Sequence, residues 1–247
     1  LIRFVMIDNE DLLKLKIPKN STIVVHASLK NLENDITKYS EITKEILEKL
    51  DDVFNPIDIF VPTFTYSFTK NKAFDVANST SEVGRFSEEA RKYLPARNRS
   101  VDPIFSVINY KNEANVYDID NSEAFGIKSI WSYLENTQHY IFNINLDSPI
   151  VATQLHYLEH QHKVPYRFNK FFEGSITDNN RIKSTVNYKY YVRNSDLPNE
   201  WDRNKIYTYA KSNNAVKQLQ NIKVFNWNKL SNLLSQNLKK NSSFLLK

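Results

Sequence analysis

Short apolar runs alternate with segments of helical periodicity in the first third of the chain. Residues 22–26, Thr-Ile-Val-Val-His, and residues 57–61, Ile-Asp-Ile-Phe-Val, are typical of strands buried on both faces. Between them, residues 40–54 carry apolar side chains at helical spacing, and Ser40 is the expected N-cap. This order of strand, helix and strand predicts a layered α/β fold.

The rest of the chain continues the alternation. Further strands are expected at 105–110, 140–144 and 183–193, the last exposed and antiparallel, and helices at 8–15, 85–94, 113–116, 129–136, 151–163 and 227–238. No internal repeat or low-complexity linker divides these segments. We therefore expect a single α/β domain over residues 1–247, with a central mixed sheet flanked by helices.

Composition narrows the kinds of chemistry that the chain can use. The 247 residues contain no cysteine, which excludes disulfides, thiolate metal ligands and cysteine nucleophiles. No apolar run approaches the roughly 18 residues of a membrane span, and residues 1–11 resemble neither a signal peptide nor an anchor. We expect a cytoplasmic protein that does not use a membrane as partner.

The charge is mildly basic and evenly spread. The formal net charge is +5, from 33 Lys and Arg against 28 Asp and Glu, without the clustered stripes that mark nucleic-acid binding. A small polyphosphate ligand would suit this balance, whereas nucleic acid is not an expected partner. Only three glycines occur, so turns with positive φ are expected at Asn and Asp residues.

Three of the five histidines lie within residues 152–163. His156, Glu159 and His160 form the H-x-x-E-H pattern of inverted zinc peptidases, which would need a further protein ligand from elsewhere. The same segment also suits proton transfer, with His156 as general base, Glu159 orienting its ring and Thr153 donating a hydrogen bond. A solvated helix face is the third interpretation, and the segment alone leaves all three open.

Two other segments suggest an anionic ligand. Residues 24–30 run from a buried strand into Ser28, Leu29 and Lys30, where backbone N–H groups, a hydroxyl and an ammonium group could meet a diphosphate. Residues 96–107 combine arginines with Ser100 and Ser106, which suits an anionic ligand but is also common in solvated loops.

Six segments in order resemble the antibiotic N-acetyltransferase family, whose best-known members are the aminoglycoside 3-N-acetyltransferases. They are Val25-His26-Ala27-Ser28-Leu29, Pro62-Thr63-Phe64-Thr65, Phe74-Asp75 with Gly84, Arg99-Ser100-Val101-Asp102-Pro103-Ile104-Phe105-Ser106, Thr153-Gln154-Leu155-His156-Tyr157-Leu158-Glu159 and Val164-Pro165-Tyr166-Arg167. The resemblance runs from about residue 10 to the end of the chain. Ala27 departs from the family pattern, which has serine there.

The resemblance implies an acyl-CoA-dependent transferase that acylates an amine, with acetyl-CoA as co-substrate and no metal. It gives His156 the role of general base and Glu159 that of orienting the base, and it places Thr153 near the thioester. The implied coenzyme residues are Ser28 and Leu29 at the diphosphate, beside Lys30 from the strand-end pattern, and Arg99, Ser100 and Ser106 along the pantetheine arm. Direct attack of an amine on a thioester needs no enzyme nucleophile, which agrees with the lack of cysteine.

The acceptor is expected to be a small-molecule amine, on an amino sugar or an aminoglycoside. Tyr66, Tyr166 and Glu173 are the expected acceptor contacts. Because a polycationic drug needs an acidic pocket and the acids here are scattered, an amino sugar of biosynthesis is favoured. A zinc hydrolase and a non-catalytic sugar- or nucleotide-binding protein remain alternatives, and the acyl chain length and the oligomeric state, a homodimer included, are open.

Overall fold

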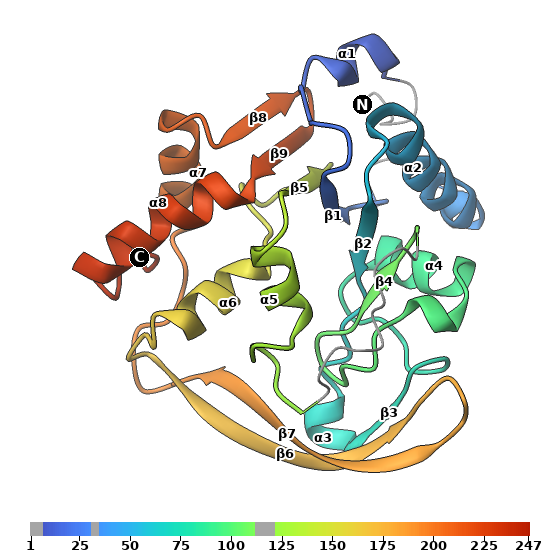
Figure 1. Cartoon of the computed structure of the whole chain (residues 1–247), viewed down its shortest axis with the longest axis vertical. Helices are drawn as coiled ribbons and strands as arrows, with labels where there is room; N and C mark the ends of the chain where they lie inside the picture. Colours follow the sequence, from blue (N-terminus) through green and yellow to red (C-terminus); the bar gives the residue numbers. More distant parts are fainter. Residues whose placement is uncertain (1–6, 31–34, 112–121) are drawn as a thin grey trace.

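A computed structural model describes residues 7–30, 35–111 and 122–247, and its centre is a six-stranded mixed sheet (Figure 1). The strand order is β4-β2-β1-β5-β9-β8. The strands are β1 (Thr22–Ala27), β2 (Asp58–Pro62), β4 (Val107–Asn109), β5 (His139–Ile144), β8 (Val216–Leu219) and β9 (Ile222–Asn226). β1 pairs in parallel with β2 and β5, whereas β4, β9 and β8 join antiparallel. The expected mixed α/β sheet is confirmed.

Alternate residues of the central strands enter two apolar cores, one on each face of the sheet. Ile23 and Val25 face one core, which is covered by α1 (Asn9–Leu13), α2 (Tyr39–Phe54) and α4 (Arg85–Tyr93). Val24 faces the other core, which is covered by α5 (Ile130–Glu135), α6 (Gln154–Gln161), α7 (Arg203–Ser212) and α8 (Trp227–Lys240). Burial of both faces explains why these strands are continuously apolar.

A second sheet of three strands lies below the first in Figure 1. It consists of β3 (Ala73–Asp75) and the long hairpin of β6 (Arg167–Thr177) and β7 (Lys183–Arg193). Helix α3 (Phe68–Asn71) packs so closely on β6 that a Cβ added at Gly174 would lie 2.7 Å from the Phe68 ring and from the Lys72 carbonyl oxygen. This close approach requires glycine at position 174.

Several sequence expectations differ from the structure. Ser40 is not an N-cap, because the 3₁₀ turn η2 (Ile36–Lys38), itself capped by Asp35, runs directly into α2. A second 3₁₀ turn, η3 (Ala96–Asn98), was not expected, nor were β3, β6, α3, α7, β8 and β9. The expected helix at 113–116 and residues 1–6 lie outside the described residues. In the part of the chain that is described, no helix is long and apolar enough to cross a membrane.

A histidine buried in the sheet makes the fold sensitive to acid. His139 on β5 is fully buried, and burial lowers its pKa from 6.5 to about 4. Below pH 6.5 the unfolded state therefore binds a proton that the folded state does not. The free energy of unfolding thus decreases as the pH is lowered from about 6.5 to about 4. For one such histidine the loss at pH 5 is about 2 kcal/mol.

We expect His139→Leu to reduce this acid sensitivity. Urea unfolding at pH 7 and pH 5 should show a smaller loss of stability on acidification for the variant than for the wild type. His162→Leu is the matched control, because His162 is only partly buried and should leave the pH dependence nearly unchanged. Equal losses in wild type and His139→Leu would assign the acid sensitivity to other groups.

Candidate active site

A cavity of about 160 Å³ opens where β1 and β2 end at the central sheet. His26 on β1, Pro62 on β2 and the start of α6 contribute to its wall, because the carboxyl ends of parallel strands meet at one edge of the sheet. Its other lining residues are mainly apolar or aromatic: Phe64, Tyr66, Val83, Val151, Ala152 and Trp201, with Arg203 at one side. The site is therefore a small pocket with apolar and aromatic side chains and two imidazole groups, His26 and His156, in its wall.

Helix α6 presents two of the predicted catalytic side chains to this cavity. Thr153 is the N-cap of α6, yet its side chain makes no capping hydrogen bond. His156 lies one turn further along, and its backbone N–H donates to the Thr153 carbonyl oxygen at 2.8 Å. The cap and first turn of the helix thus place the hydroxyl and the imidazole on the same cavity wall, as the sequence spacing predicts.

The His156 ring is held by two charged side chains. Its Nδ1 lies 3.0 Å from Oε2 of Glu159 and 2.8 Å from Nη2 of Arg167, while Arg167 Nε lies 2.7 Å from the same Glu159 oxygen. Arginine can only donate, so Nδ1 is protonated when it pairs with Glu159 and unprotonated when it pairs with Arg167. Only the first tautomer leaves a lone pair on Nε2 that can accept a proton.

Trp201 completes this network and was not singled out by the sequence. Its Nε1 donates to Oε1 of Glu159 at 2.6 Å, and its ring lies 4.4 Å from the His156 ring, centroid to centroid. Each carboxylate oxygen of the fully buried Glu159 is therefore engaged. A lone tryptophan between polar residues carries no spacing signal, so only the fold could reveal this contact.

The buried network fixes the protonation states of the pair. Burial lowers the pKa of His156 to about 4, and the Arg167 charge acts in the same direction, although Glu159 opposes it. Burial alone would raise the pKa of Glu159, but the hydrogen bond and charge of His156, the charge of Arg167 and the Trp201 hydrogen bond together lower it. At neutral pH the imidazole is neutral and the carboxylate is ionised, which is the state a general base requires.

The three residues expected at the coenzyme diphosphate lie at the end of β1 but outside this cavity. The Ser28 N–H is used by the sheet, since it donates to the Ile144 carbonyl oxygen at 3.1 Å. The Leu29 side chain is buried in a core, so only its backbone could face a ligand, and Lys30 is exposed. Their role in binding the coenzyme stays a prediction.

The expected pantetheine contacts of Arg99, Ser100 and Ser106 must be corrected, because all three side chains are fully buried. The Arg99 guanidinium donates to the carbonyl oxygens of Thr63, Val76 and Ser79 and to the hydroxyls of Thr63, Thr65 and Ser106, at 2.6–3.1 Å. The Ser100 hydroxyl accepts from the Val107 N–H, and the Ser106 hydroxyl donates to the Thr63 carbonyl oxygen. These side chains tie loops together, and no guanidinium donor is left for a coenzyme.

Of the expected acceptor contacts, the structure brings only Tyr66 to the cavity. Tyr166 is buried at 2 % exposure near Glu159, and burial together with the Glu159 charge raises its pKa. Glu173 is exposed on the β6–β7 hairpin and does not line the His156 cavity. The sequence could not show this, because the hairpin carries Glu173 away from α6.

The zinc alternative has no ligand set in the described residues. His160 lies one turn beyond His156 on α6 but does not line the His156 cavity; its Nε2 is 3.8 Å from Oε1 of Glu123, and Phe125 packs against both imidazole rings. Glu159 is enclosed by Arg167 and Trp201. Across residues 7–30, 35–111 and 122–247, no group of three His, Asp or Glu side chains is arranged to hold a metal ion.

Comparison with known proteins gives a family match and several similar structures. A family model for aminoglycoside 3-N-acetyltransferase matches residues 24–234. Similar solved structures include the YokD protein from Bacillus subtilis (17% identity, 94% of this chain and 97% of that chain, TM-score 0.67). Others are sisomicin-bound AAC-VIa (14%, 94% and 96%, TM-score 0.74) and AAC-IIIb with CoASH (15%, 94% and 94%, TM-score 0.74). No curated protein sequence matches the chain.

Proposed function

The chain belongs to the aminoglycoside 3-N-acetyltransferase family, and we propose that it transfers an acetyl or other short acyl group from coenzyme A to an amine of an amino sugar or aminoglycoside. The observation that carries this proposal is the buried network around His156. The neutral imidazole of His156 lines a small cavity, and its Nδ1 lies 3.0 Å from the ionised carboxylate of Glu159. A cytoplasmic location remains a prediction.

In the proposed reaction, the unprotonated acceptor amine attacks the thioester carbonyl carbon of acetyl-CoA. The new C–N bond forms and the C–S bond breaks, while Nε2 of His156 takes the proton from the amine nitrogen. The imidazolium then returns this proton to the departing sulfur, so the products are an amide and the coenzyme A thiol. No covalent intermediate with the enzyme is required.

Each neighbour of His156 has a separate task in this scheme. Glu159 holds Nδ1–H and stabilises the imidazolium, and Trp201 and Arg167 fix the carboxylate in place. The hydroxyl of Thr153 makes no capping hydrogen bond to α6, so it can donate to the oxyanion that develops on the thioester oxygen. Ser28, the Leu29 backbone and Lys30 are the proposed contacts of the coenzyme diphosphate.

The non-catalytic alternative is tested by thiol release from acetyl-CoA. We expect release to require an amine, and we would measure it with glucosamine and a panel of aminoglycosides, with glucose as the matched control that lacks the amine. The coupled appearance of N-acetylated product should match the thiol formed. Thiol release that is equal with glucosamine and glucose would instead indicate thioester hydrolysis, and no release with any acceptor would contradict the proposed transfer.

A further inference from the structure

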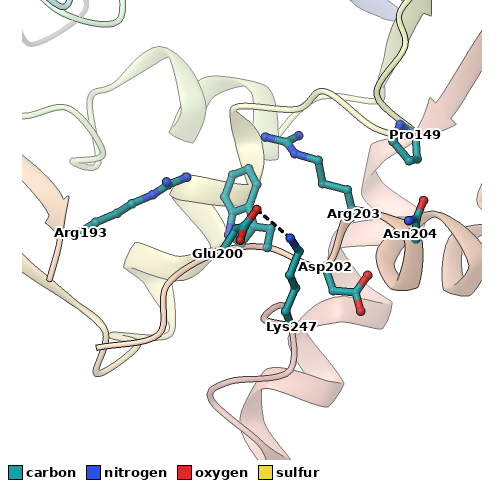
Figure 2. A pocket seen from close by; sticks show the side chains of 8 residues that line it. Pro149, Arg193, Glu200, Asp202, Arg203, Asn204 and Lys247 are labelled. Atoms are coloured by element: carbon teal, nitrogen blue, oxygen red, sulfur yellow. Dashed lines mark ion pairs between the residues drawn. The ribbon is translucent and has the colours of Figure 1, made fainter. Parts of the chain in front are cut away.

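A second cavity adjoins the one that contains His156. It has a volume of about 370 Å³, and Trp201 and Arg203 belong to the walls of both cavities. Its remaining wall is formed by Pro149, Arg193, Lys247 and other residues of the segment 200–204 (Figure 2). The two cavities therefore lie next to one another at the Trp201 and Arg203 side chains.

Two guanidinium groups converge on the second cavity. Arg193 and Arg203 extend toward one another from β7 and from the start of α7 (Figure 2). Their guanidinium carbons lie 6.0 Å and 5.2 Å from the Trp201 ring centroid. Arg203 also donates to the Ile150 carbonyl oxygen at 2.6 Å, which anchors it at the boundary of the two cavities.

The two acidic side chains of this cavity have partners other than its arginines. Glu200 forms an ion pair with Lys247 at 2.8 Å, and Asp202 caps α7 by accepting from the Lys205 N–H at 2.9 Å. Within the described residues, neither Arg193 nor Arg203 forms an ion pair with a carboxylate. Burial and the charge of Arg193 lower the pKa of Arg203, although Glu200 opposes this. The cavity thus holds two positive groups whose mutual repulsion an anion would relieve.

We propose that this second cavity binds a negatively charged group, phosphate or carboxylate, of the acceptor, so that the enzyme acts on an anionic amino sugar. The inference rests on the proposed acyl transfer. Two guanidinium forks match the oxygens of such a group, whereas a polycationic aminoglycoside would bring further positive charge beside them. The coenzyme also carries phosphates, but its expected contacts, Ser28 to Lys30, line neither cavity.

Glucosamine and glucosamine 6-phosphate form a matched pair that differs only in the phosphate. By calorimetry in the presence of coenzyme A, we expect the wild type to bind the 6-phosphate at least 10-fold more tightly than glucosamine. Arg193→Gln, which lies outside the His156 cavity, should reduce this preference several-fold without weakening glucosamine binding, and the double variant with Arg203→Gln should abolish the preference. Arg181→Gln is the charge-matched control, since Arg181 lies in the exposed turn of the β6–β7 hairpin, pairs with Asp75 of β3 and lines neither cavity.

Equal binding of the two sugars by the wild type would overturn the proposal. So would a double variant that loses 10-fold or more in affinity for coenzyme A but keeps its affinity for dephospho-coenzyme A, because the cavity would then hold a phosphate of the coenzyme. If the 6-phosphate preference appears in binding while no amine stimulates thiol release, the anion site stands and the proposed acyl transfer fails. Circular dichroism and urea unfolding of each variant separate these results from loss of folding.

Discussion

Replacing His156 with alanine is expected to lower kcat/KM for the acceptor by about 10²- to 10⁴-fold, the usual contribution of a positioned general base. The loss should appear in kcat, because the imidazole acts on a proton that moves only in the transition state. Binding of coenzyme A should stay within a few-fold of wild type. The measurement is steady-state thiol release, with calorimetry for coenzyme binding.

His160→Ala is the matched control for this result. Both histidines lie on α6, but His160 does not line the His156 cavity, so its variant should keep nearly full activity. If His160→Ala loses activity together with stoichiometric zinc, the zinc alternative is correct. If His156→Ala retains activity within about five-fold, another group is the base.

The pH profile gives a second view of the same residue. Because the pKa of His156 is lowered to about 4, the base is unprotonated from pH 5 upward. Between pH 5 and 8 the His156 imidazole should therefore stay unprotonated. The rise of kcat/KM with pH should instead follow deprotonation of the acceptor ammonium. A break near pH 6.5 that disappears in His156→Ala would show that the ring titrates normally instead.

The second large effect is expected on stability, from Arg99→Met. Methionine fills part of the volume but leaves the carbonyl oxygens of Thr63, Val76 and Ser79 without their buried donor. We expect a loss of about 3–5 kcal/mol in the free energy of unfolding, since several buried acceptors become unsatisfied at once. Urea unfolding measures this loss directly.

Arg97→Met is the control for Arg99→Met, because Arg97 is exposed two residues away and should change stability by less than about 0.5 kcal/mol. Coenzyme binding by the folded Arg99 variant at low temperature should remain close to that of the wild type. If the Arg99 variant is as stable as the wild type but binds coenzyme A 10-fold more weakly, the result would support the pantetheine contact that the resemblance implies.

The hydrophobic pattern of the sequence predicts strands that are buried on both faces, and helices and strands that have one buried face and one exposed face. Residues 183–193 alternate visibly, and β7 has these bounds in the structure. The sequence does not predict the edge strand β8 or its neighbour β9, because both are short and follow a polar segment. Tyr166 and Glu173 are expected acceptor contacts, whereas Tyr166 is buried in the core and Glu173 is exposed on the β6–β7 hairpin.

The site shows the same division between local and distant contacts. Thr153, His156 and Glu159 lie within two turns of one helix, so their spacing was enough to place them together. Arg99 could not be assigned from spacing, because an arginine between serines is compatible with both a ligand loop and an internal clamp. Trp201, 42 residues beyond Glu159, depended on how the chain returns to α6.

The distance of Trp201 from Glu159 along the chain should affect the order of events during refolding. His156, Glu159 and Arg167 come together across at most 11 residues, so this part of the network can form as soon as α6 and the start of β6 exist. The indole of Trp201 arrives only when a loop nearly four times as long has closed. During refolding, recovery of acyl transfer should therefore lag behind formation of the helix and coincide with docking of the segment that carries Trp201.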